Sequence, residues 1–274
     1  MRLSFVVCLS DNSVLDANLM ASPCLGSGTP HEVIAIRNAP SAAAGLNLGL
    51  GRAKHDWIVY VHQDVFLPSG WDHRLEEQLR EAERRFGPVG VAGVYGVSEV
   101  VKGQDEPPAA QRIGRVVDRG RMLDEAPELP APVATLDELL LVVRRDSPLR
   151  FEPALVFHLY GADLCLQARE RELAVVALDA LCHHNSPSAG LPDSFFRSAR
   201  VFGRKWAHRL PIATPCVVFD REGGMHLLGN ASADEPHTAY AEGPPLLEGS
   251  EVLPRTRHGT VVPRTSQASV FQEG

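Results

Sequence analysis

The sequence predicts an α/β fold in which helices flank a mostly parallel sheet. Short apolar runs alternate with helical patterns through the first two thirds of the chain, a succession typical of layered α/β proteins. The chain has 274 residues, of which 44% are hydrophobic and 22% are charged, so it has enough apolar material for one large domain. We expect strands at residues 3–9, 33–36, 57–61, 89–94, 138–143 and 174–178.

The first strand and the first long helix have the clearest signals. The apolar run at residues 3–9 is too short to span a membrane, and no small-residue cleavage pattern follows it. We therefore expect a buried strand there and no transmembrane segment. Residues 72–86 are expected to form a helix, because their apolar side chains recur at helical spacing beneath a charged face, at Leu75, Leu79, Ala82 and Phe86.

The middle and the end of the chain are less regular. Residues 98–135 are rich in proline, glycine and charge without a clear period, and a connection of this length is usually functional or mobile. A helical pattern follows residue 192, and residues 217–219 and 225–228 are expected to pair as a hairpin. We divide the chain into a domain at residues 1–210 and a C-terminal hairpin with an extended polar tail at residues 211–274, an arm available for contacts in a homo-oligomer.

Charge and cysteine content narrow the class of protein. The formal net charge of −7 gives no general attraction for nucleic-acid phosphates or anionic lipids, so we expect neither as a partner. The five cysteines are odd in number and include no Cys-x-x-Cys pair. They are typical of buried thiols in a reducing compartment, and we expect a cytoplasmic protein.

One cluster of polar residues follows the predicted strand at residues 57–61. His62, Gln63 and Asp64 come directly after this strand, at the carboxyl edge where open parallel sheets bind ligands. A carboxylate there can hold a hard cation such as Mg²⁺ or Mn²⁺, which in turn binds diphosphate oxygens. The alternative is that Asp64 only caps the turn before Pro68.

Two further clusters occur later in the chain. Asp163 stands near the expected start of a helix, where it is either a cap or a functional carboxylate. His183 and His184 follow the predicted strand at residues 174–178. Adjacent residues of an extended chain point in opposite directions, so one imidazole of the pair is expected to face the site and to be a metal ligand. The sequence does not choose between the two histidines.

The order of these motifs resembles family 2 glycosyltransferases of the GT-A fold, and most closely a bacterial branch with a His-Gln-Asp metal motif, some members of which are linked to capsule and surface polysaccharide. The resemblance covers residues 3–184 and includes Asn47 in the helix before the motif, which it implies is one of the residues that bind the nucleotide-sugar. It implies that Asp64 contacts a metal and the diphosphate, that His62 faces the ribose, and that Asp163 is the catalytic base.

The activity that the resemblance implies is a metal-dependent inverting transfer, of the hexosyltransferase type, from a nucleotide-sugar to a glycan or small hydroxyl acceptor. The cofactor is then Mn²⁺ or Mg²⁺. Residues 98–135 would cover the acceptor side of the site as a lid.

The nucleotide end departs from the family pattern. Ordinary members end the second strand in an acidic pair that contacts the base, whereas this chain has Arg37 and Asn38. Asn38 can still donate and accept hydrogen bonds. Ser10 and Asp11, at the end of the first strand, are the other candidates to contact the nucleoside, and they are equally suited to forming a turn.

Other protein classes lack their signatures in this sequence. No Gly-x-Gly-x-x-Gly follows the first strand, as a dinucleotide-binding oxidoreductase requires, and no His-Glu-x-x-His motif of a zinc hydrolase is present. A sugar nucleotidyltransferase would need a glycine-rich phosphate loop near the N-terminus, which is absent. The remaining alternative is a noncatalytic GT-A-like module that binds a saccharide or a partner protein, which the missing acidic pair favours.

Overall fold

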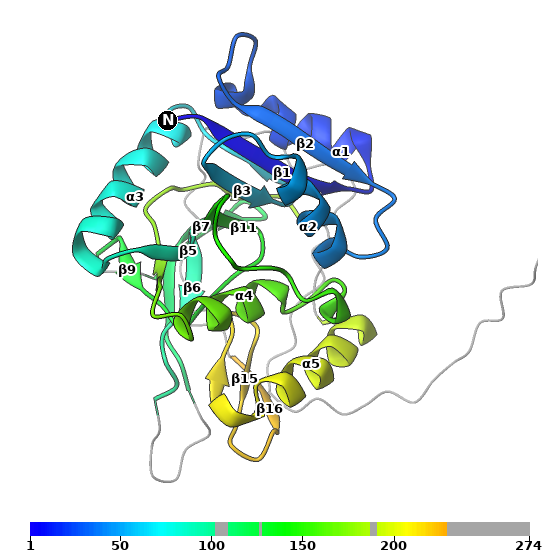
Figure 1. Ribbon diagram of the computed structural model, residues 1–274, viewed down its shortest axis with the longest axis vertical. Coiled ribbons are helices and arrows are strands. Elements are labelled where there is room, and N and C mark those ends of the chain that lie inside the picture. The colour runs from blue at the N-terminus through cyan, green and yellow to red at the C-terminus, as the bar shows by residue number, and fades with distance from the viewer. Residues whose placement is uncertain (102–108, 126–127, 187–190, 229–274) are drawn as a thin grey trace, which may run out of the picture.

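The computed structural model describes residues 1–101, 109–125, 128–186 and 191–228, and a seven-stranded sheet lies at its centre (Figure 1). In spatial order the strands are β2 (Glu32–Arg37), β1 (Leu3–Leu9), β3 (Trp57–Val61), β11 (Leu140–Arg144), β5 (Val89–Gly93), β12 (Ala174–Ala177) and β9 (Ala131–Pro132). Strands β2, β1 and β3 run parallel, as do β5 and β12, whereas β11 is antiparallel to both its neighbours and β9 to β12. The predicted α/β class with a mostly parallel sheet is confirmed.

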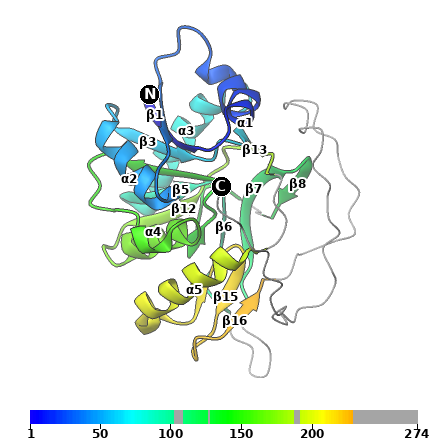
Figure 2. The ribbon, with the colours of Figure 1, turned by 90° about the vertical axis from the view of Figure 1, so that its right-hand side faces the viewer.

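Alternate residues of the central strands pack into two separate cores, because successive side chains of a strand point to opposite faces. Val6 and Ile58 face one core, and Phe5 and Val59 face the other. Helices α2 (Ala42–Arg52), α4 (Tyr160–Arg169) and α5 (Asp193–Lys205) contribute to the first core, and α1 (Asn12–Ala17) and α3 (Trp71–Phe86) to the second. Figure 2 shows α2 and α4 on one side of the sheet and α3 on the other.

The long helix α3 forms where the apolar spacing predicts it. Its buried side chains include Leu75, Leu79 and Ala82, and it lies between Gly70 and Gly87, which have φ angles of 77° and 80°. Glycine adopts this left-handed region without the steric cost that other residues incur. The predicted helix at residues 72–86 is therefore confirmed to within one residue.

A second sheet lies beside the first and was not predicted. It contains β10 (Thr135–Leu136), β6 (Tyr95–Val97), β7 (Arg112–Asp118), β13 (His183–His184) and β4 (Val65–Phe66), with β8 (Arg121–Asp124) paired to β7. Figure 2 shows β7 and β8 on the side away from α2 and α4. Strands β7 and β8 fall within residues 98–135, which the sequence analysis treats as irregular.

Strand β7 escapes a sequence-based prediction because its stability depends on distant partners. Its apolar residues do not alternate regularly, and Gly114 adopts a φ angle of 137° where a Cβ atom would lie 2.2 Å from the carbonyl oxygen of Val94. The strand is held instead by pairing with β6, β8 and β13. Residues 102–108 and 126–127 of the predicted lid lie outside the described residues.

The chain after residue 210 forms the expected hairpin. Strands β15 (Val217–Phe219) and β16 (Met225–Leu227) pair antiparallel, and β14 (Ile212–Ala213) pairs with β15. The ring of Phe219 lies 5.2 Å from that of Phe202 in α5, so the hairpin packs against the same core as α5. The predicted tail from residue 229 onward lies outside the described residues.

Four short 3-10 helices complete the described elements: η1 (Leu19–Ala21), η2 (Pro23–Leu25), η3 (Pro153–Leu155) and η4 (Ala207–Arg209). Across the described ranges, no helix combines the length and the apolar composition needed to cross a membrane.

Candidate metal and nucleotide site

The candidate site lies where the ends of several strands meet. His62 and Asp64 connect β3 to β4, and the backbone N–H of His62 donates a hydrogen bond to the carbonyl oxygen of Leu139, just before β11. Strand β13 pairs antiparallel with β4, which sets His184 opposite Val65. The N–H of Asn185 then donates to the carbonyl oxygen of Asp64 at 2.8 Å. Segments more than a hundred residues apart in the sequence are thereby fastened together.

These pairings bring His62, Asp64 and His184 into one cluster, which we call the metal group. One potential ligand atom of each residue lies within 4.8 Å of the others. Oδ1 of Asp64 lies 3.6 Å from Nε2 of His184 and 4.0 Å from Nδ1 of His62. Within the described part of the chain, Oδ1 of Asp64 and Nε2 of His184 are buried atoms that lack a hydrogen-bond partner. Buried polar atoms are rarely left unpaired, so this pair requires an explanation.

Asp118, at the end of β7, orients His184. Its Oδ1 lies 3.1 Å from Nδ1 of His184, and the parallel register of β13 with β7 sets the two residues side by side. With Nδ1 donating to the carboxylate, Nε2 faces Asp64. A carboxylate bound to the far nitrogen of a ligating histidine is the usual support of a metal site.

His183 points to the other side of β13, as alternation along a strand requires. Its ring packs edge-on against Phe66 at 5.8 Å and is 6% exposed. Burial lowers the pKa of His183. Of the two adjacent histidines that the sequence left open, His184 is the one in the group with Asp64.

The charges around the site act differently on the two grouped histidines. Burial lowers the pKa of His184, but the hydrogen bond to Asp118 and the charges of Asp64 and Asp137 outweigh burial and leave the pKa above its usual value. For His62, burial dominates and holds the pKa below its usual value, although Asp64 and Asp137 act in the opposite direction. Nε2 of His62 lies 3.1 Å from the hydroxyl of Tyr160, which leaves Nδ1 toward Asp64.

The unpaired atoms fit a divalent cation. Ligand atoms of Mg²⁺ lie about 2.1 Å from the ion, so two atoms up to about 4.2 Å apart can share one ion. The 3.6 Å between Asp64 and His184 is too long for a hydrogen bond and falls within this limit. A carboxylate oxygen with an imidazole nitrogen is a donor set that suits Mn²⁺ and also admits Mg²⁺.

Ser10 and Asp11, expected to contact the nucleoside, form a turn that Gln63 holds. Oε1 of Gln63 accepts the N–H groups of Ser10 at 2.9 Å and Asp11 at 3.1 Å, and its amide donates to the Ser10 hydroxyl at 2.8 Å. Oδ1 of Asp11 caps α1 by accepting the N–H groups of Ser13 and Val14. The middle residue of the His-Gln-Asp motif thus fastens the end of β1 to the metal group.

Asn38 and Asn47 occupy different surroundings. Asn38 is exposed after β2, with a left-handed φ angle of 53°. The side chain of Asn47 bonds the backbone of Phe151 in both directions, donating at 2.8 Å and accepting at 3.0 Å. Asn47 therefore ties α2 to the segment before η3, and its amide is occupied within the protein.

Asp163, expected to be the base, is fully buried in α4. Its Oδ1 accepts from the indole N–H of Trp206 at 2.8 Å and lies 2.7 Å from the ammonium of Lys205, while Oδ2 accepts from the amide of Gln167 at 2.7 Å. A base must reach the proton that it removes, and this carboxylate has no exposed surface. The surroundings of Asp163 are those of a residue that joins α4 to the end of α5.

Three polar residues at this edge were not predicted from the sequence: Asp118, Asp137 and Tyr160. Asp118 lies in the unpredicted strand β7. Asp137 directly precedes the strand predicted at residues 138–143, which begins at Leu140 in the structure. The signal that could have found Asp137 is its position before β11. Because β11 is antiparallel, its amino end meets the carboxyl ends of the parallel strands.

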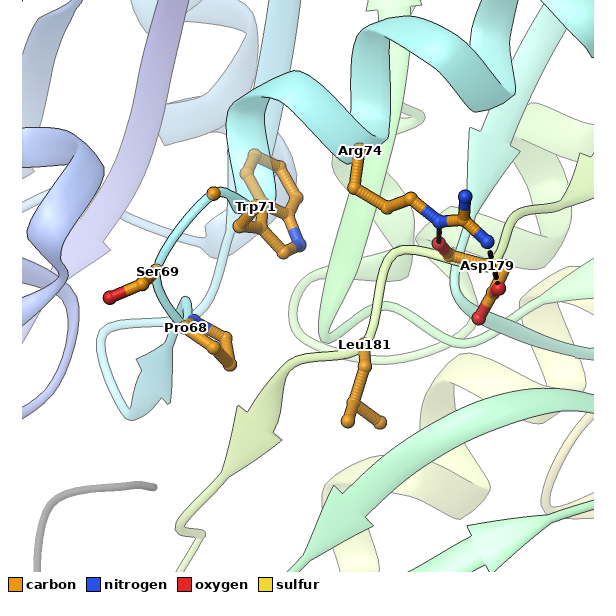
Figure 3. A pocket seen from close by; sticks show the side chains of 7 residues that line it. Pro68, Ser69, Trp71, Arg74, Asp179 and Leu181 are labelled. Carbon is orange, nitrogen blue, oxygen red and sulfur yellow. Dashed lines mark hydrogen bonds and ion pairs between the residues drawn. The ribbon is translucent and has the colours of Figure 1, made fainter.

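A separate hollow lies beside the start of α3, lined by Pro68, Trp71, Arg74, Asp179 and Leu181 among others (Figure 3). Its charged groups are already paired, because Arg74 binds the side chain and the carbonyl oxygen of Asp179. It includes no residue of the metal group.

Comparison of the sequence with known protein families identifies the family of this chain. Residues 4–193 match the family described as "Glycosyltransferase like family". The chain belongs to this family. The resemblance inferred from the His-Gln-Asp motif and its flanking segments is thereby confirmed, and the glycosyltransferase-like match includes all of the grouped residues.

One curated protein is related to this glycosyltransferase-like chain. It is 31% identical over 168 residues to "ATP synthase subunits region ORF 6" of Fuscovulum blasticum, a match that covers 59% of this chain and 64% of that protein. The chain therefore spans under two thirds of the length of the curated relative that it matches.

Two of the solved structures that match this chain are 13% identical to it. S. aureus TarS has a TM-score of 0.44, over 75% of this chain and 39% of TarS. Glucosyl-3-phosphoglycerate synthase from Mycobacterium tuberculosis, in complex with Mg²⁺ and UDP, has a TM-score of 0.43, over 79% of this chain and 82% of that chain.

Proposed function

We propose that the protein is a glycosyltransferase that binds a nucleotide-diphosphate sugar through a divalent metal held by Asp64 and His184. The observation that carries this proposal is the pair of buried, unpaired ligand atoms, Oδ1 of Asp64 and Nε2 of His184. Asp64 lies between β3 and β4 and His184 lies in β13, and these two atoms are 3.6 Å apart. Family membership supplies the reaction class, and the donor set supplies the reason for a metal.

Each residue of the group has a role in this proposal. A bound divalent cation neutralises diphosphate oxygens and so assists departure of the nucleotide. Asp64 and His184 hold the cation, Asp118 fixes the ring of His184, and His62 is placed by Tyr160 at the rim of the group. Gln63 holds the turn after β1 in place by accepting the backbone N–H groups of Ser10 and Asp11.

The finer features of the proposal come from the family resemblance. We propose transfer with inversion to a hydroxyl of a glycan, such as a surface or capsule polysaccharide, or of a small acceptor, with Mn²⁺ or Mg²⁺ as the cofactor. The exposed Asn38 remains the candidate to contact the nucleoside. None of the five cysteines forms a disulfide, which supports the reducing cytoplasm that we propose. The expectation of buried thiols holds for Cys165 and Cys182, whereas Cys216 is exposed.

A noncatalytic sugar-binding module is the second candidate. Ser10, Asp11 and Asn47 were expected to contact the nucleotide, but they form hydrogen bonds within the protein instead. This observation favours the binding module. Such a module would bind a saccharide without metal-dependent nucleotide affinity.

A thermal-shift screen of UDP-, GDP- and dTDP-sugars, with and without Mn²⁺, separates these candidates. At a ligand concentration a hundredfold above Kd, binding adds about 2.7 kcal/mol of stability. We expect a shift that needs both nucleotide and Mn²⁺ in the wild type and in Asp124→Asn, a surface carboxylate control, but not in Asp64→Asn. A metal-independent shift with free saccharides alone would support the binding module, and no shift with any nucleotide would reject the proposed transferase.

A further inference from the structure

An inverting glycosyl transfer uses a general base that can reach the acceptor hydroxyl, and the sealed position of Asp163 leaves that role open. Three carboxylates of the described residues act on the charge of His62 or His184: Asp64, Asp118 and Asp137. Asp64 belongs to the metal group. Asp118 is occupied by His184 and by the guanidinium of Arg119.

Asp137 is held beside the metal group by the backbone. The antiparallel register sets Leu140 of β11 opposite Val61 of β3, and the next contact outward is the bond from the N–H of His62 to the carbonyl oxygen of Leu139. Asp137 lies two residues before Leu139, and its charge acts to raise the pKa of both His62 and His184. The N–H of Asp137 donates to the carbonyl oxygen of Tyr95 at 2.8 Å, which anchors the residue from the other side.

The carboxylate of Asp137 is free to act. Its Oδ1 accepts the N–H of Leu139 at 3.0 Å, a local turn that fixes the orientation of the group. Its Oδ2 has no hydrogen-bond partner among the described residues, and the side chain is partly exposed. Asp137 therefore differs from Asp163, both of whose oxygens are bound inside the protein.

The adjacent Glu138 has a different environment. Its Oε1 accepts the N–H of Gly161 at 3.1 Å, at the start of α4, where the N-cap residue Leu159 provides no side-chain cap. Burial raises the pKa of Glu138 to about 8, although the α4 amides oppose this. Glu138 thus caps α4 from outside the helix, and burial disfavours its charged form.

We propose that Asp137 is the catalytic base of the transfer, an inference that rests on the proposed function. In this step the acceptor oxygen bonds to the anomeric carbon as the bond from that carbon to the diphosphate oxygen breaks. The diphosphate leaves with the electron pair, and the hydroxyl proton passes to Oδ2 of Asp137. With water as the acceptor, the same step releases the free sugar and the nucleotide diphosphate.

The test compares Asp137→Asn with Glu138→Gln in the full chain. Asparagine can keep the local turn by accepting the N–H of Leu139, so a purely structural role of Asp137 would survive the substitution. The assay measures nucleotide diphosphate release from UDP-, GDP- and dTDP-sugars with Mn²⁺, with water or simple sugars as acceptors. Calorimetry measures the affinity for the same nucleotide diphosphate with Mn²⁺.

For Asp137→Asn we expect kcat to fall by about 10²- to 10⁴-fold, the usual contribution of a general base, with unchanged nucleotide affinity and melting temperature. Glu138→Gln should keep the wild-type kcat. Retention of kcat in Asp137→Asn would overturn the assignment, and so would a parallel loss of nucleotide affinity, which would make Asp137 part of the metal site. A wild type that binds nucleotide and Mn²⁺ but releases no product, or that binds neither, would reject the proposed function together with this inference.

Discussion

Asp64 and Asp163 are both carboxylates beside the end of a secondary-structure element, yet their surroundings differ in kind. Asp64 has a buried oxygen without a partner, next to an imidazole nitrogen that also lacks one. Asp163 has both oxygens bound, to Trp206, Lys205 and Gln167. An unmet hydrogen-bonding requirement, more than burial or position along the chain, therefore marks the carboxylate that is available to a ligand.

The largest effect is expected from Asp64→Asn. The substitution removes the charge of a proposed metal ligand, and even residues that only support such ligands are typically worth about 10- to 100-fold in metal affinity. We expect metal-dependent nucleotide affinity to fall by more than this, with the fold intact by circular dichroism. Calorimetry with UDP and Mn²⁺ checks the loss. Unfolding of the variant, with normal affinity in the part that remains folded, would make Asp64 structural.

A smaller loss is expected from Asp118→Asn, which weakens the support of His184 without removing a ligand. Metal affinity should fall by about 10- to 100-fold. Asp124→Asn, on the paired strand β8, is the matched control because Asp124 binds Arg115 and lies outside the metal group. Equal affinities of the two variants would show that the bond from Asp118 to His184 has no functional role.

Metal affinity should also depend on pH. A metal binds the neutral imidazole, and the pKa of His184 lies above its usual value of 6.5. Affinity should therefore hold at alkaline pH and fall as the pH drops through this raised pKa, by up to about tenfold per pH unit. In Asp118→Asn the decline should begin at lower pH, because the hydrogen bond that raises the pKa is weakened. Identical pH profiles for the two proteins would contradict this explanation.

The smallest effect on function is expected from Asp163→Asn. The variant replaces one accepting carboxylate oxygen by a donating NH₂ group and removes the charge opposite Lys205. The free energy of unfolding should therefore fall by about 1–3 kcal/mol. Turnover of the folded protein should be unchanged. Denaturant unfolding and kcat are the two measurements, with the exposed Asp193→Asn in α5 as the control. A stable variant whose kcat falls by about 10²-fold or more would identify Asp163 as the catalytic base.

Local patterns predicted the central sheet well. Strands β1 and β3 and helix α3 carry continuous apolar runs or helical spacing, and their predicted bounds agree with the structure to within one residue. Such elements bury their own apolar residues, so their signal lies in the segment itself. The antiparallel direction of β11 left no such signal, because a buried strand has the same composition in either direction.

The site was harder to predict, because its geometry depends on pairing between distant segments. Asp64 and the pair of histidines were named from their positions at strand ends. The choice of His184 over His183 required the register of β13 with β4 and β7. Asp118 lies in a strand whose apolar residues show no regular alternation. The contacts of Asp163 with Trp206 and Lys205 depend on how α5 packs against α4.

The central claim is that Asp64 and His184 hold a divalent metal, and the adjacent histidines offer the most direct test. Titration of Mn²⁺ in the presence of UDP, followed by electron paramagnetic resonance, counts bound ions in the wild type, His184→Ala and His183→Ala. We expect His183→Ala to bind Mn²⁺ as the wild type does and His184→Ala to lose the bound ion. Undiminished binding in folded His184→Ala, or loss only in His183→Ala, would show that His184 is not a metal ligand.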